Sequence, residues 1–115
     1  MKVDKHFHDL FSFLPEHVKH RTLILAKAVD WHIRYFARKN KIPITSVTLS
    51  AYSDDGYIVP YLLVGVRISN VREMMKKWDD TVTYVWGLLG DIIRKIDIFF
   101  TREDAEEYAK SEAVQ

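Results

Sequence analysis

The stretch from residue 42 to residue 68, IPITSVTLSAYSDDGYIVPYLLVGVRI, decides the fold. From Ile42 to Ser53, apolar and polar residues alternate, which is typical of a strand with one buried face. The run from Tyr57 to Ile68 is rich in Val, Ile, Leu and Tyr, and Asp54-Asp55-Gly56 is a turn sequence between the two runs. The sequence therefore predicts a β-hairpin.

The number of residues in the hairpin loop decides which side chains share a face. An even number aligns six residues of the two strands on one face: Val47, Leu49, Ala51, Pro60, Leu62 and Val64. It aligns a second set on the opposite face: Thr48, Ser50, Tyr52, Val59, Tyr61 and Leu63. An odd number breaks this match. Because Pro60 cannot donate to a ladder, we expect the second strand to be an edge, or bulged, near its start.

A long amphipathic helix is predicted before the hairpin, from Glu16 to Asn40. Five of its residues fall within about 40° of one line at 100° per residue: Val18, Thr22, Leu25, Val29 and Phe36. Pro15 suits the first turn, and Pro43 ends the pattern. The apolar arc is wide, because further apolar residues extend it on both sides: Ile24, Ala28, Trp31, Tyr35 and Ile33. We expect a central helix with partners on two sides.

A second long helix is predicted after the hairpin. Asn70 and Glu73 resemble a capping box, and apolar residues then recur with unbroken 4-3 spacing from Val71 to Ile96. The run from Thr81 to Trp86 favours β-structure and leaves a strand as the alternative there.

Two further elements are predicted near the C-terminal end. Ile96 to Phe100 fits a buried strand reached by a right-handed crossover, and Thr101 starts a last helix with Asp104 at its capping-box position. The expected fold is a single α+β domain over residues 1–115. It has a small mixed β-sheet of about three strands, in α-β-β-α-β-α order, packed against helices. The edges of such a sheet favour a homodimer.

Composition fits one soluble domain. The chain has 115 residues, 48% of them apolar, and no cysteine, which excludes disulfides, zinc–thiolate sites, iron–sulfur clusters and thiol nucleophiles. No apolar run approaches the roughly 18 residues that span a bilayer, and the first 13 residues lack the apolar core of a signal peptide. We therefore expect a cytoplasmic protein with no membrane association.

Charge is unevenly distributed along the chain. Residues 1–41 carry nine Lys and Arg against four Asp and Glu, whereas residues 42–115 carry eight against twelve. On the first helix, His20, Lys27, Arg34 and Arg38 point within about 20° of one direction. Spacing of this kind suits contacts with successive phosphates, and the predicted nucleic-acid-binding cations are Lys27, Arg34, Arg38, Lys39 and Lys41. An ordinary solvated helix face is the alternative.

Tyr52 and Tyr61 are predicted to project together from the sheet, with Tyr57 near the turn. Exposed rings stack nucleobases or anchor a protein partner, so both tyrosines complete the predicted nucleic-acid site. The motif of aromatic sheet-face RNA-binding modules is absent from residues 56–61. A helix or a dimer mate covering this face is the alternative.

The five histidines provide a weaker set of metal-ligand candidates: His6, His8, His17 and His20, with His32 further along. No HExxH or other ligand spacing fixes a geometry, so surface histidines, with His32 partly buried and hydrogen-bonded, are the expected state. No glycine-rich phosphate loop, G-x-S-x-G motif or paired-carboxylate motif is present, and no cofactor is expected.

The sequence thus favours a small binding protein over an enzyme. The first hypothesis is sequence-independent nucleic-acid binding by the basic helix face. The alternative is a homo-oligomeric protein-interaction module without a nucleic-acid role, and a histidine-based metal-dependent hydrolase is a third class.

Overall fold

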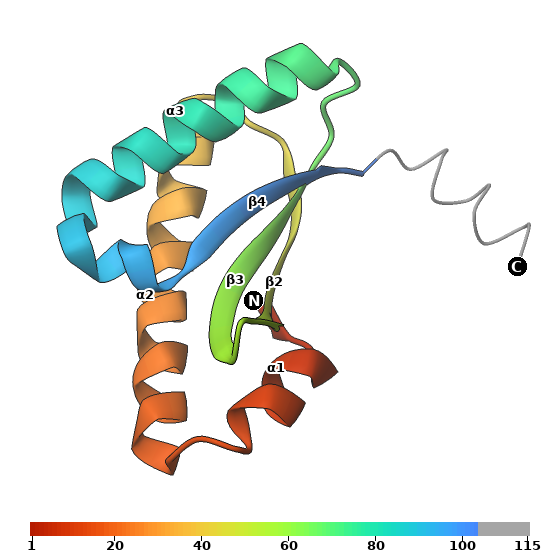
Figure 1. Ribbon diagram of the computed structural model, residues 1–115. Coiled ribbons are helices and arrows are strands. Elements are labelled where there is room, and N and C mark those ends of the chain that lie inside the picture. Colours follow the sequence, from red (N-terminus) through yellow and green to blue (C-terminus); the bar gives the residue numbers. More distant parts are fainter. Residues whose placement is uncertain (104–115) are drawn as a thin grey trace, which may run out of the picture.

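The computed structural model describes residues 1–103, except for the side chains of residues 92–94. The elements in chain order are β1 (Lys2–Val3), α1 (Lys5–Phe11), α2 (Glu16–Lys39), β2 (Ile44–Asp54), β3 (Tyr57–Val66), α3 (Val71–Leu89), the 3₁₀ helix η1 (Gly90–Lys95) and β4 (Asp97–Arg102). The fold class is α+β, as predicted, with a mixed sheet in the order β1-β2-β3-β4 (Figure 1).

The hairpin of β2 and β3 has the predicted register. Asp54 pairs with Tyr57, so the loop has two residues, Asp55 and Gly56, with φ of 48° and 80°. Positive φ at both positions is the geometry of a type I′ turn, for which an Asp-Gly pair is favoured. Leu49 pairs with Leu62, and the two predicted faces form as the even loop requires.

The third long strand follows the predicted crossover. β4 runs parallel to β3 and pairs with it from Tyr61 to Val66, while α3 makes the connection. Pro60 precedes the first of these pairs, so its missing N–H leaves no gap in the β3–β4 ladder. The predicted unpaired edge at the start of the second strand is confirmed.

The N-terminal residues add a strand and a helix that the sequence analysis missed. Lys2 and Val3 pair in parallel with β2, so the sheet has four strands among the described residues instead of about three. Asp4 then caps α1, because its Oδ1 accepts from the Phe7 backbone N–H at 3.0 Å. Phe7 and Phe11 stack with centroids 4.3 Å apart and are both buried. A seven-residue helix presents too short a pattern for periodicity to detect.

α2 has nearly the predicted span but a shifted buried face. Its buried residues are Ala26, Val29, Ile33 and Ala37. Four residues of the predicted central line are only half-buried: Val18, Thr22, Leu25 and Phe36. The small side chains of Ala26 and Ala37 lie against the rest of the core and leave larger residues outside it.

The end of α2 depends on Lys41 more than on Pro43. Lys41 has φ of 55°, and the Ile42 backbone N–H donates to the Ala37 carbonyl at 2.8 Å. Ile42 and Ala37 are both buried. This is the Schellman arrangement, in which the left-handed residue is commonly glycine.

α3 confirms the helical interpretation of residues 81–86. The Asn70 side chain accepts from the Glu73 backbone N–H at 3.1 Å, as the capping sequence predicts. The long helix is confirmed as far as Leu89, but it does not follow the 4-3 spacing to Ile96, because Gly90 has φ of 57° and η1 follows. The predicted last helix does not start at Thr101, which lies in β4; its remaining part falls outside the described residues.

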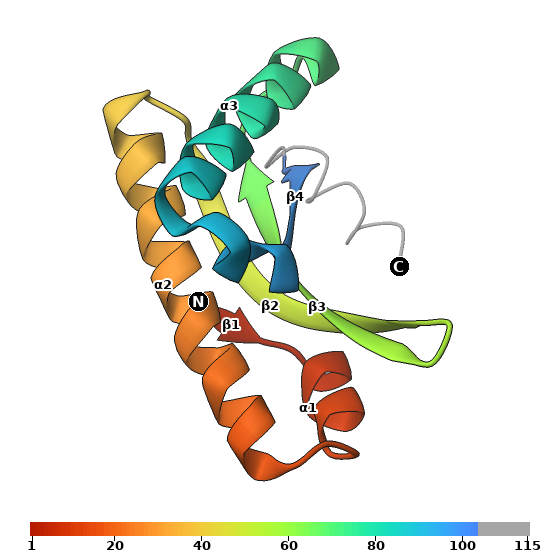
Figure 2. The ribbon, with the colours of Figure 1, turned by 60° about the vertical axis from the view of Figure 1, so that its left-hand side comes forward.

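One layer of helices covers one face of the sheet. The buried side chains of α2 and α3 share a core with those of β2, β3 and β4, and Figure 2 shows both helices on the same side. No element within residues 1–103 covers the central part of the other face, where Tyr52 and Phe99 remain exposed. None of the helices in this range is long and apolar enough to cross a lipid bilayer.

Glu103, directly after β4, forms hydrogen bonds to β3 and β2 on the uncovered face. Its backbone N–H donates to the Val66 carbonyl at 2.8 Å, and its carboxylate accepts from the hydroxyls of Thr45 and Ser46. A β-carbon added at Gly65 would lie 2.5 Å from Glu103 Cδ and 2.6 Å from Ser46 Oγ. The glycine therefore makes room for this contact between β4 and β2.

Candidate functional site

The solvent side of α2 carries aromatic and basic side chains together. We define the α2 solvent face by Ile24, Lys27, Trp31, Tyr35, Arg38 and Lys39. Trp31 is 61% exposed and Ile24 is 56% exposed, although both are large apolar residues. At 100° per residue, Trp31 lies on the opposite side of the helix from Val29 and Ile33, which are fully buried.

The two rings of the α2 solvent face lie against each other. The centroids of Trp31 and Tyr35 are 5.5 Å apart and their planes differ by 7°. Lys39 Nζ lies 4.9 Å from the centroid of the Tyr35 ring, within the range of a cation–π contact. Hydrogen bonding and charge interaction with Tyr35 raise the pKa of Lys39. A continuous aromatic surface thus has fixed positive charge at its C-terminal end.

The five predicted cations are all exposed: Lys27, Arg34, Arg38, Lys39 and Lys41. Arg34 Nε donates to Asp30 Oδ1 at 2.8 Å in an i, i+4 ion pair, whereas Lys27 and Arg38 have no ion-pair partner within residues 1–103. Arg34 and Arg38 line a hollow of about 200 Å³ with Ile42 and Ile44. Both arginines therefore border the same hollow beside the end of α2.

Tyr52 and Tyr61 come together on the uncovered sheet face, as the register predicts. Their centroids are 5.7 Å apart, and Phe99 of β4 approaches Tyr61 edge-on at 5.7 Å. The Tyr52 hydroxyl donates to Asp97 Oδ2 at 3.2 Å. Partial burial, then this hydrogen bond and the negative charge of Asp97, raise the pKa of Tyr52.

The structure does not bring these tyrosines next to the basic residues. α2 packs through its buried residues on the core face of the sheet, and Tyr52 and Tyr61 project from the opposite face. The aromatic neighbours of Lys27 and Arg38 are Trp31 and Tyr35, which the sequence analysis assigned to the apolar arc. In the sequence, Trp31 and Tyr35 lie between Lys27 and Arg38 at helical spacing, and this pattern could have predicted a mixed aromatic and basic surface.

The histidines are distributed over two helices. His6 and His8 lie on α1, and His17 and His20 lie on α2. Within residues 1–103, no three His, Asp or Glu side chains gather to hold a metal ion. His32 is half-buried as predicted, but its buried Nδ1 has no hydrogen-bond partner among the described residues, so the predicted hydrogen bond is wrong.

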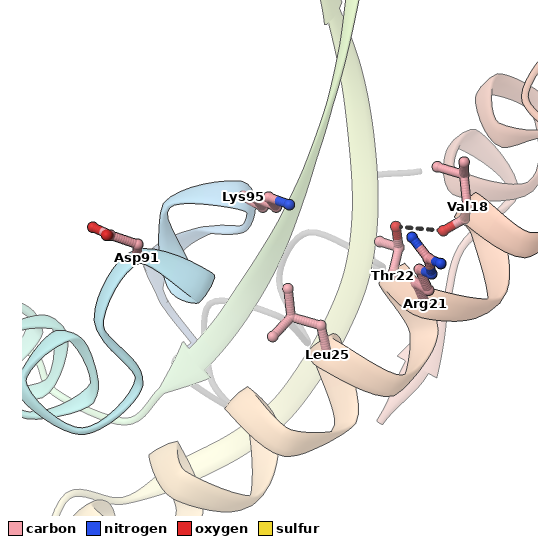
Figure 3. Close-up of a pocket in the computed structure, with 6 residues that line it drawn as sticks. All are labelled: Val18, Arg21, Thr22, Leu25, Asp91 and Lys95. Atoms are coloured by element: carbon pink, nitrogen blue, oxygen red, sulfur yellow. Dashed lines mark hydrogen bonds between the residues drawn. The ribbon is translucent and has the colours of Figure 1, made fainter.

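A cavity of about 480 Å³ separates the N-terminal half of α2 from η1. Its lining includes Val18, Leu25, Arg21 and Lys95. Figure 3 shows the Lys95 ammonium pointing across the space toward α2, while the Asp91 carboxylate points away from it. The lining thus combines apolar residues with the two cations Arg21 and Lys95 and the carboxylate of Asp91. Arg21 belongs to the helix that carries the α2 solvent face, and Lys95 belongs to η1.

Comparisons with known proteins give no further assignment: no protein-family model, curated protein or solved structure matches the chain.

Proposed function

We propose that this chain is a cytoplasmic protein that binds nucleic acid without sequence preference through the α2 solvent face. The observation that carries the proposal is the exposed Trp31–Tyr35 stack with Lys27, Arg38 and Lys39 around it. Cations neutralise backbone phosphates, and aromatic rings stack on bases of any sequence. The α2 solvent face offers both groups between Lys27 and Lys39, over a little more than about three helical turns.

Charge supports a polyanion as the partner of this face. A second copy of the chain facing α2 would bring Lys27 and Arg38 near the same cations of its mate, which like-charge repulsion disfavours. A nucleic acid releases counterions at each neutralised phosphate and so gains affinity from those same charges. Arg34 joins this set by exchanging its half-buried partner Asp30 for a phosphate, because an i, i+4 pair on a helix surface contributes only about 0.3–0.5 kcal/mol.

The test is fluorescence anisotropy with labelled single-stranded RNA, single-stranded DNA and duplex DNA at several salt concentrations. We expect the logarithm of the affinity to fall linearly with the logarithm of salt concentration. The double variant Lys27→Glu/Arg38→Glu is compared with Arg72→Glu/Lys76→Glu, which makes the same charge change on exposed α3 positions. An equal loss of affinity in both pairs, or no binding at low salt, would refute the proposal.

The aromatic contribution has its own test. Trp31→Ala removes the exposed ring but no charge. We expect weaker binding by about 1–3 kcal/mol, with an unchanged salt slope, because base stacking does not release counterions. Trp86→Ala, on α3, is the matched control for loss of an exposed tryptophan.

Self-association through the uncovered sheet face is a second candidate function. It is favoured by the contacts of Tyr52, Tyr61 and Phe99, which form a row of rings across three strands. Two carboxylates on this face, Asp97 and Glu103, oppose a nucleic acid and already accept hydrogen bonds from side-chain hydroxyls. We infer that a second copy of the chain packs here, which makes the protein a homodimer.

Light scattering tests the dimer. Tyr61→Arg places a charge in the middle of the row of rings, and we expect it to yield monomers. Tyr57→Arg is the control, because Tyr57 is 76% exposed near the turn. A wild-type monomer, or a Tyr61→Arg dimer, would remove this face from the interface.

A further inference from the structure

A second cavity lies where α3 meets the free edge of β4. Its volume is about 290 Å³, close to the lower end of ligand pockets at roughly 300 Å³. Aromatic residues line it from two elements: Trp78 and Trp86 from α3, and Phe99 from β4. Val82 and Ile98 supply aliphatic walls, and Asp97 is its charged lining residue.

The aromatic walls are partly preorganised. The Trp78 Nε1–H donates to the Ile98 carbonyl at 2.7 Å, which fixes the indole against β4. Phe99 is held edge-on to Tyr61, with an angle of 68° between the planes. Trp86 and Phe99 remain 55% and 42% exposed, so a ligand can reach them.

The cavity has negative electrostatic character. Asp97 is half-buried, and it has no cationic partner within residues 1–103. The Tyr52 hydroxyl donates to its Oδ2 and holds this oxygen on the uncovered sheet face. The faces of tryptophan and phenylalanine rings also carry partial negative charge, which attracts cations.

We propose that this cavity binds an organic cation through a methylated ammonium group, with the rings of Trp78, Trp86 and Phe99 around the methyl groups and Asp97 balancing the charge. A neutral apolar ligand leaves the carboxylate without a counter-charge, and an anion is repelled by it. A hydrated inorganic ion gains little from apolar walls, because it must first lose water. The proposal does not depend on the nucleic-acid proposal, and it shares Phe99 and Asp97 with the sheet face proposed for the dimer.

The experiment is an NMR titration of the ¹⁵N-labelled full chain, following the indole N–H signals of its three tryptophans. Choline is the first probe, and 3,3-dimethylbutanol, its neutral isostere, is the control ligand. We expect choline to move the Trp78 and Trp86 signals at concentrations where the isostere does not, while the Trp31 signal stays in place. Equal shifts with both ligands, or shifts confined to Trp31, would overturn the proposal.

Two variants test the assigned roles. Asp97→Asn keeps an oxygen for the Tyr52 hydroxyl but removes the charge, and we expect at least about tenfold weaker choline binding, since even a partly screened charge pair at 4 Å exceeds that energy. Asp80→Asn, an exposed position on α3, is the matched control. Unchanged affinity in Asp97→Asn, with the fold intact by circular dichroism, would overturn the role of the carboxylate.

Two ligand arms separate the sources of the methylated ammonium group. One uses free choline and the other a peptide containing trimethyllysine, with the unmethylated peptide as its control. Tighter binding of the methylated peptide than of choline assigns the cavity to a modified protein side chain. Choline binding at least as tight assigns it to a free small molecule. Failure of both probes to bind better than their controls refutes the site.

Discussion

A single substitution at Lys41 is expected to raise the free energy of unfolding and at the same time to lower the affinity for nucleic acid. The φ of 55° at Lys41 is the left-handed conformation, which suits glycine better than a residue with a β-carbon. Lys41 is also one of the five cations that the sequence predicts to bind nucleic acid, and it follows the α2 solvent face directly along the chain. Lys41→Gly should therefore stabilise the fold and weaken binding, whereas Lys41→Ala should weaken binding without stabilising.

The size of the stability change follows from two opposing terms. The left-handed conformation costs a residue with a β-carbon roughly 1–2 kcal/mol, and glycine avoids this cost. Glycine also loses more chain entropy on folding, about 0.4–1 kcal/mol. The backbone hydrogen bond from Ile42 to Ala37, 2.8 Å long, is kept in both variants. We expect a net gain of about 0.5–1 kcal/mol for Lys41→Gly in the free energy of unfolding.

Urea denaturation and anisotropy measure the two effects on the same preparations. Loss of one phosphate contact should reduce the salt slope by about 0.9 for duplex DNA or about 0.7 for single strands, equally in both variants. No stability gain in Lys41→Gly would show that the helix end is not strained at this residue. Full binding by both variants would remove Lys41 from the nucleic-acid site.

Three further predictions concern the packing of the sheet and its ends. Gly65→Ala should cost about 1 kcal/mol by displacing the Glu103 carboxylate, and a urea double-mutant cycle should show that this cost disappears when Glu103 is already Ala. Asp4→Ala should lower the free energy of unfolding by about 1 kcal/mol, because α1 loses its cap. Asp97→Asn should lower the raised pKa of Tyr52, as followed by tyrosinate absorbance. The stabilisation linked to the raised pKa of Tyr52 is complete below about pH 10 and is lost as the pH rises further. Asp97→Asn should therefore reduce the loss of stability at alkaline pH, as measured by urea denaturation.

The parts of the fold that the sequence predicts well are those set by local geometry. Asp55 and Gly56 admit the two-residue turn, and the side-chain period of two then fixes both faces of the hairpin. The Asn70 cap and the 4-3 spacing likewise override the β-favouring run from Thr81 to Trp86. In each case the deciding interaction lies within a few residues of chain.

The missed parts depend on contacts distant in sequence. β1 has only two residues and exists because β2 offers an unpaired edge at Thr48 and Leu49. Phe99 was not included with Tyr52 and Tyr61, because its neighbourhood depends on the parallel register of β4 against β3. The order of residues within one strand does not show how β4 aligns with β3.

The two sides of α2 provide the strongest physical argument for a binding role. Ordinarily the largest apolar side chains of a helix are buried, since burial of such a side chain contributes about 1.5–3 kcal/mol. Here Ala26 and Ala37 are buried while Trp31 and Ile24 lie in solvent. Packing within residues 1–103 gives no reason for this inversion. The proposed ligand on the α2 solvent face supplies one, because covering Trp31 would favour complex formation, and the surrounding cations are the reason why we propose a polyanion as that ligand.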